Sequence, residues 1–371
     1  MFLFLDFMLV AGITVTIIIL FLILKQRNKQ LPHIVLAVFF VIILCIIINL
    51  YTDLHKIKSI YFISYIPHDI ARWLLGPLLF IYVKSLFLKK KDAFRALALH
   101  FAPVVLYGIF ISIPTLITLR IEKLNFEYLY FFNEYSFFVT QLSNSYTIIY
   151  FIISYVFLSK YSNNITAVYA NISKRDIRWI SYILIGGSIL ISLNSIIEIY
   201  QNVDETSTNY SNLFTLLGLI FFILYLGYYG VHQSKILLPD FLFKKNTNKK
   251  ASHFSKEEEV AFSQLKSRLE SVLDKEKLYL DNELTLIKLA EKIATTDKKL
   301  SALLNQYMQI SFYDIINRYR TEAVKKMIDS DSYKDYTLLG IAYECGFNSK
   351  ASFNRIFKKE TGLSPSQYKN R

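Results

Sequence analysis

The chain has 371 residues, of which 53% are apolar and 19% charged, and its mean hydropathy is +0.34. This composition excludes disordered and collagen-like chains and favours a protein that is partly embedded in lipid. The two cysteines, Cys45 and Cys345, exclude a disulfide framework and a thiolate metal site, and the six His lack metal-ligand spacing, so we expect no metal and no cofactor.

The density of charged residues increases after Lys235. Residues 1–235 hold 18 Lys and Arg against 11 Asp and Glu, whereas residues 236–371 hold 24 against 18. The second part therefore has the charge density of a basic soluble domain, and the first part does not. The sequence predicts a membrane part followed by a water-soluble part.

Seven runs in the first part are apolar over about 20 residues, the length that a helix needs to cross a bilayer. The first run lacks the basic start and the small-residue cleavage site of a signal peptide, so we expect it to be retained. The sequence therefore predicts an all-α protein with a seven-span, sensor-like bundle over 1–232. The runs are roughly 2–24, 34–52, 66–87, 97–119, 137–158, 178–198 and 212–232.

The loops between these runs predict the orientation, because Lys and Arg concentrate on the cytoplasmic side of a membrane. Loops one, three and five carry 12 Lys and Arg, and loops two, four and six carry 4. The N-terminus is therefore predicted outside and the C-terminus in the cytoplasm.

Ionisable side chains inside the runs are costly in lipid and favour a functional interpretation. Asp69 and Arg72 lie three residues apart on one helix face, so they can neutralise each other as packing groups or take part in binding a signal ligand. Both interpretations stay open. Further polar groups of this kind are Asp6, His68, Glu198, Asn49 and Asn194.

After the last run, residues 233–254 are polar and basic, which is typical of a juxtamembrane linker that anionic lipid attracts. Ser255 and Glu258 then form a capping-box pattern, and apolar residues follow at roughly helical spacing, namely Val260, Leu265, Leu269 and Val272. This connecting helix, 255–278, can pack on the next domain or pair two chains into a homodimer.

The last 90 residues contain an internal repeat. Thr285–Ala290 recurs 52 positions later as Thr337–Ala342, and each copy is followed by a tight connection and a second amphipathic helix. This is the helix-turn-helix pattern, whose second helix enters the major groove of DNA. A longer helix at about 312–328 joins the two copies.

The motifs LTLIKLAEKI, LSALLNQY, SFYDIINRYRTEAVKKMI and TLLGIAYECGFNSKASFNRIFKKETGLSPSQY carry a family resemblance. They make the chain from about residue 280 to 371 similar to the AraC/XylS-type DNA-binding domain, and we set its boundaries at 279–371. WLLGPLLFIYVKSL and HFAPVVL resemble multi-span regulators from the Bacteroidetes group. The resemblance implies double-stranded DNA and RNA polymerase as partners, and the inner membrane of a bacterium as the location. The first copy departs from the family pattern at Ala302, Leu304 and Gln309.

Helical geometry places several polar side chains on the outer faces of the two second helices, which Thr296 and Ser349 are expected to cap. Asn354 suits an adenine edge, Arg355 a guanine edge or a phosphate, and Lys359 a phosphate. An ordinary solvated face is the alternative for each Lys. The predicted DNA contacts are Lys298, Lys299, Asn305, Lys350, Asn354, Arg355 and Lys358.

These observations predict a membrane-bound, sequence-specific transcription regulator that couples a signal at the membrane half to promoter DNA. The alternative is a membrane receptor or transport-like protein whose helix-turn-helix domain binds proteins. The sequence holds no Gly-rich phosphate loop, nucleophile motif or plausible carboxylate pair, so we do not expect an enzyme.

Overall fold

The described part of the chain is helical and contains no named strand, which confirms the all-α prediction. It splits into two compact units, one formed by Met1–Lys160 and Arg178–Leu237, the other by Tyr161–Ile177 and Leu238–Arg371. The computed structural model describes residues 2–26, 29–94, 97–121, 127–134, 136–162, 164–170, 177–203, 210–233, 236, 238, 255–333 and 335–371. Most of the predicted juxtamembrane linker therefore lies outside the described residues.

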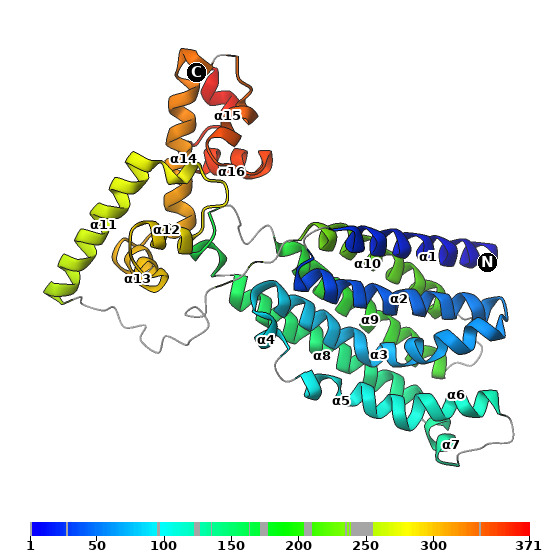
Figure 1. The fold of residues 1–371 in the computed structure, drawn as a ribbon. Helices are drawn as coiled ribbons and strands as arrows, with labels where there is room; N and C mark the ends of the chain where they lie inside the picture. Colours follow the sequence, from blue (N-terminus) through cyan, green and yellow to red (C-terminus); the bar gives the residue numbers. More distant parts are fainter. Residues whose placement is uncertain are drawn as a thin grey trace. The chain divides into compact units, whose positions relative to one another are not determined.

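The first unit is a bundle of long apolar helices (Figure 1). Each of the seven predicted spans falls in one of its helical segments, and the fourth is interrupted by a π-helical turn, η1 (Gly108–Ser112). Short helices α4 (Lys90–Ala93) and α7 (Glu127–Glu134) lie in the connections. The long segments are α1 (Phe2–Lys25), α2 (Leu31–Leu54), α3 (Lys58–Phe87), α5 (Leu97–Tyr107) with α6 (Ile113–Arg120), α8 (Ser136–Ser162), α9 (Arg178–Val203) and α10 (Tyr210–His232).

Six of these segments are long and apolar enough to cross a membrane, and the apolar part of α10, Leu216–Val231, is shorter. α1 packs against α2 and α10, α2 against α3, and α9 against α10. Large apolar side chains such as Leu3, Ile63 and Phe221 remain 81%, 79% and 74% exposed in the described bundle. Lipid is the medium in which such surfaces are stable, so the bundle indicates membrane association.

Asp69 and Arg72 of α3 form an ion pair. Arg72 Nη2 lies 3.3 Å from Asp69 Oδ1, Tyr107 OH donates to the same carboxylate oxygen over 3.3 Å, and Arg72 Nη1 donates to Thr140 Oγ1 over 3.2 Å. Mutual neutralisation of Asp69 and Arg72 is therefore present, and a role for them in ligand binding stays a prediction.

The second unit holds two helix-turn-helix pairs joined by a long helix, as the repeat predicts. The first motif is α12 (Leu286–Lys292) with α13 (Asp297–Ala302), which continues as a π-helical turn, η6 (Leu303–Tyr307). The second motif is α15 (Leu338–Glu344) with α16 (Lys350–Thr361). The linker helix between them is α14 (Phe312–Ile328). The remaining elements are η2 (Ile165–Ala167), α11 (Lys256–Glu276), η5 (Leu278–Leu280), η7 (Asp331–Tyr333) and α17 (Pro365–Lys369).

The first turns of these helices are capped by hydroxyl side chains. Thr296 Oγ1 accepts from the backbone N–H of Lys299, and Ser349 Oγ accepts from that of Ser352, each over 3.2 Å. The Ser255–Glu258 capping box at the start of α11 is also formed. Since each cap satisfies an N–H that the helix itself leaves unpaired, the sequence fixes where these helices begin.

The connecting helix α11 packs on the first motif between Phe262 and Leu273. Leu269 and Leu273 are fully buried, and the ring of Phe262 stacks on that of Tyr307 with centroids 5.5 Å apart. Val260, near the other end, is 58% exposed. Packing on the domain therefore uses apolar residues from Phe262 onward, and pairing of two chains along this helix stays a prediction.

Gln309, where the family resemblance expects Gly, has a φ of +53°, in the left-handed region that disfavours residues with a Cβ by about 1 to 2 kcal/mol. We expect Gln309→Gly to stabilise the second unit by on the order of 0.5 to 1 kcal/mol, because the greater freedom of Gly in the unfolded chain offsets part of the relief. Urea unfolding of the full-length chain in nanodiscs, followed by pulse proteolysis, measures the change. Gln306→Gly, within the helical backbone, should instead destabilise by about 1 kcal/mol.

Candidate nucleic-acid interface

The second motif is positioned by a continuous apolar core shared with the linker helix. α14 contributes Tyr313 and Val324, and the recognition helix α16 turns its predicted inner face toward them. Because interiors are close-packed, this core fixes which side of α16 remains outside. The buried members of the core are Tyr313, Val324, Ile341, Ala342, Cys345, Phe347, Phe353, Ile356, Phe357 and Tyr368.

A buried arginine connects the linker helix by hydrogen bonds to the segment before the first motif. The sequence analysis did not predict this role. Arg320 has no exposed surface, its Nε donates to the carbonyl of Tyr279 over 2.7 Å, and its Nη2 donates to that of Asp281 over 2.8 Å. Burial lowers its pKa to about 10, so the guanidinium stays charged near neutral pH. The available signal was its position four residues after Ile316 and four before Val324, on the inner face of α14.

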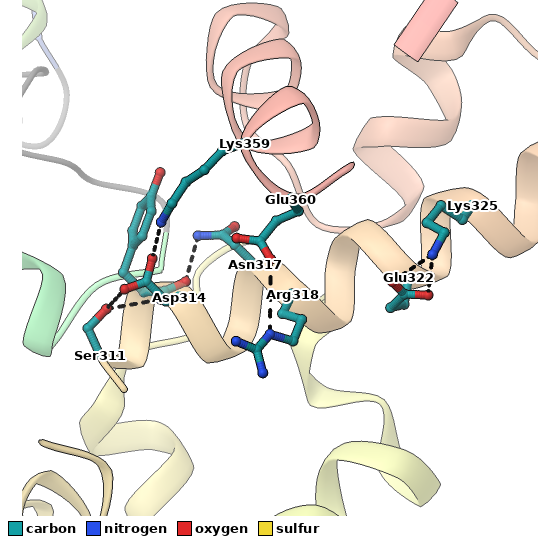
Figure 2. A network of polar contacts seen from close by, with 9 residues as sticks. Ser311, Asp314, Asn317, Arg318, Glu322, Lys325, Lys359 and Glu360 are labelled. Carbon is teal, nitrogen blue, oxygen red and sulfur yellow. Dashed lines mark hydrogen bonds and ion pairs between the residues drawn. The ribbon is translucent and has the colours of Figure 1, made fainter. Parts of the chain in front are cut away.

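Ion pairs attach the recognition helix α16 to the linker helix α14 (Figure 2). Lys359 Nζ lies 2.7 Å from Asp314 Oδ1, and Arg318 Nε lies 4.0 Å from Glu360 Oε2. Ser311 donates its hydroxyl to the other oxygen of Asp314 over 2.6 Å. Lys359, which the sequence offered as a phosphate contact, is therefore engaged within the domain.

The Asp314 pair gives the second unit a pH dependence. Burial alone would raise the pKa of Asp314, but the hydrogen bonds from Lys359 and Ser311 outweigh it and lower the pKa. The unfolded carboxyl binds its proton near pH 4. The pair therefore stabilises the fold above that pH and loses this contribution as pH falls through the lower, folded pKa.

We accordingly expect Asp314→Asn to destabilise the unit at neutral pH and to have a vanishing effect at low pH. The measurement is the urea midpoint of variant and wild type between pH 7 and pH 3. Asp335→Asn, at an exposed position without such partners in the described chain, serves as the control. A constant difference across the range would contradict the assignment.

Five of the seven predicted DNA contacts are exposed and have no side-chain partner among the described residues. They are Lys298 and Lys299 on α13, and Lys350, Asn354 and Lys358 on α16. These side chains are therefore available to an external ligand, and three of them occupy one outer face of α16.

The other two predicted contacts are engaged within the domain. Asn305 Nδ2 donates to the carbonyl and to the hydroxyl of Ser301, over 3.0 and 3.2 Å. The guanidinium of Arg355 lies 6.0 Å from the ring centroid of Tyr313, a cation–π distance. Both residues therefore already have contacts within the domain.

Cys345 belongs to the core. It has no exposed surface, and burial raises the pKa of its thiol to about 12. A thiol in this state is unreactive, since the thiolate is the reactive form. The described residues also contain no group of three or more His, Cys, Asp or Glu that could hold a metal ion.

Comparison with known proteins agrees with this geometry. Residues 289–371 match a family model described as a helix-turn-helix domain. Over 102 residues the chain is 31% identical to uncharacterized HTH-type transcriptional regulators from Staphylococcus aureus strains COL, MSSA476 and N315. The aligned part is 28% of this chain and covers only 13% of each relative. No solved structure matches the chain. Residues 289–371 are thus a helix-turn-helix domain, similar to the AraC type.

Proposed function

We propose that this protein is a membrane-bound transcription regulator that binds specific promoter DNA from the cytoplasmic face of a bacterial inner membrane. One observation carries the proposal: two capped recognition helices, held by one buried scaffold, leave Lys298, Lys299, Lys350, Asn354 and Lys358 exposed without internal partners. Cationic and amide side chains on such helices match phosphates and base edges.

The two motifs would address neighbouring segments of the major groove. Recognition helices that read successive turns of B-DNA are about 34 Å apart along its axis. A rigid connection between motifs is needed to keep that spacing, and α14 supplies it through Arg320 on one side and the Asp314–Lys359 pair on the other. One chain would therefore read a bipartite site, with a second copy and RNA polymerase as further partners.

The placement of residues 161–170 supports the seven-span topology. This loop between α8 and α9 belongs to the same compact unit as the C-terminal domain, so both must lie on the same side of the membrane. Only an even number of crossings between them meets that requirement. Since α9 is long enough to span, α10 should cross as well, and the Lys and Arg asymmetry puts this side in the cytoplasm.

A cavity inside the first unit offers a place for the signal. It has a volume of about 260 Å³ and a mainly apolar lining, and Asn144, Asn194 and Thr147 are among its lining residues. A largely apolar pocket with few polar groups is typical of a small-molecule site. We place the unknown ligand here, with the Asp69–Arg72 pair as the alternative position.

The test is DNA binding by the full-length chain in nanodiscs. Selection from random duplexes should enrich one bipartite sequence, and its affinity should exceed that of scrambled duplex by about 10³-fold or more at physiological salt. Affinity that ignores sequence and disappears at moderate salt would favour the alternative, a receptor whose helix-turn-helix domain binds proteins.

A further inference from the structure

The loop between α8 and α9 packs against the linker helix α14 and against the start of the first helix-turn-helix motif. The chain runs from the end of α8 at Ser162 into the short helix η2, which packs against α14. Ile165, Val168 and Ala170 each have at most 1% of their surface exposed. A loop that only connected two spans would not bury three apolar residues in a soluble domain.

Backbone hydrogen bonds fix the position of this loop. Tyr169 forms an antiparallel bridge with Thr285, and the N–H of Leu286 donates to the carbonyl of Val168 over 2.9 Å. The first N–H groups of a helix have no partner within it. At α12, Thr285 caps the N–H of Lys288, and the loop satisfies that of Leu286.

A buried amide on the linker helix makes the second attachment. Asn317, 1% exposed, donates from Nδ2 to the carbonyl of Ala170 over 2.8 Å and to its own helix at Tyr313. A buried polar group without partners costs about 1 to 3 kcal/mol, so the loop carbonyl stabilises this position. The loop thus touches the start of α12 and the middle of α14, and it leaves the exposed side chains of α13 and α16 uncovered.

We propose that residues 164–170 are a second anchor between the membrane half and the DNA-binding domain, through which movement of α8 and α9 reaches the first motif. The loop then contacts the first motif, and in the described part of the chain the second motif is connected to the loop only through α14. This inference rests on the proposed function for its effect on DNA, but the anchor itself exists without DNA. Thr337 is the residue of the second repeat copy that corresponds to Thr285. Among the described residues, no loop forms backbone hydrogen bonds with it in the way that residues 168 and 169 do with the start of α12.

A disulfide tests the anchor. Residues opposite each other in an antiparallel bridge have Cα atoms about 4.5 to 5.5 Å apart, which suits a disulfide. The full-length chain in phosphatidylcholine nanodiscs would carry Tyr169→Cys and Thr285→Cys, with a protease site inserted within residues 245–250. After mild oxidation and cleavage, the two fragments should stay joined until a reductant is added.

Four further variants define the result. Tyr169→Cys with Ser366→Cys, on α17 after the second motif, should not join the fragments, and neither should Tyr169→Cys alone with the native thiols. Val168→Asp should abolish joining, because burial of an unpaired carboxylate is opposed by several kcal/mol. Thr166→Asp, at a half-buried position of the same turn, should not. Absence of the bridge in the Tyr169–Thr285 pair would overturn the proposal.

DNA binding tests the effect of the anchor. We expect Val168→Asp to weaken binding of the full bipartite duplex by about tenfold, which is 1.4 kcal/mol. Binding to a duplex that keeps only the half read by α16 should not change, since the loop does not touch that motif. Equal affinities of Val168→Asp and Thr166→Asp for the bipartite duplex would overturn the coupling, whereas a chain that forms the bridge but selects no DNA would overturn the proposed function and leave the anchor standing.

Discussion

We expect Asn354→Ala to relax the choice of base at one position of the proposed DNA site and to weaken binding of the selected sequence by about 1 to 3 kcal/mol, roughly 5- to 150-fold. The reason is geometric. Asn354 lies on the outer face of α16, exposed and without a side-chain partner among the described residues, and a free carboxamide pairs in a bidentate manner with an adenine edge. Measurement by titration against the selected duplex and its single-base variants gives the preference at each position.

A lysine on the same face should behave differently. Lys358→Ala should weaken binding to all sequences nearly equally and lower the slope of log affinity against log salt by about one, because a phosphate contact carries no base preference. Lys326→Ala, which removes the same charge from an exposed position on α14, is the control for charge, and Asn370→Ala on the last turn is the control for the amide. If Asn354→Ala lost affinity equally for every duplex, α16 would not read bases.

Most of the helix-turn-helix architecture could be predicted from the sequence because it depends on local signals. The pattern within each copy of the repeat, the caps at Thr296 and Ser349, and the inward residues of α16 each depend on side chains only a few residues apart. Local hydrogen bonds and helical periodicity are what a single sequence reveals best. The bounds of α14 and the burial of Phe353 and Phe357 agree with the prediction for this reason.

The contacts that the sequence did not reveal join distant segments through the backbone. The carbonyls of Val168, Ala170 and Tyr279 accept hydrogen bonds from positions 41 to 147 residues away, and a backbone carbonyl is the same in every residue type. For the same reason, the sequence does not reveal which lysines of the candidate interface are left without a partner in the domain. Lys359 and Lys358 are adjacent in sequence and alike in chemistry, yet only Lys359 has Asp314 within reach.

The connection between the two helices of the second motif depends on a glycine that no other residue can replace. Gly346 has a φ of +84°, and a Cβ at this position would lie 2.7 Å from the carbonyl oxygen of Tyr279 and 2.8 Å from that of Leu280. The first of these oxygens is also the acceptor of Arg320. A methyl group would therefore strain its own backbone and displace the segment that the buried arginine holds.

We expect Gly346→Ala to destabilise the second unit by about 2 to 5 kcal/mol, of which about 1 to 2 come from the left-handed backbone and about 1 to 3 from overpacking. Gly362 is the matched control, since its φ is +79° but a Cβ there meets nothing within 4 Å, so Gly362→Ala should cost only about 1 to 2 kcal/mol. Urea unfolding of the full-length chain in nanodiscs, read by pulse proteolysis, gives both values. Amide exchange in α14 should accelerate in Gly346→Ala far more than in Gly362→Ala, because only the first change reaches the acceptor of Arg320. Equal costs for the two alanines would show that the contact with residues 279 and 280 does not stabilise the domain.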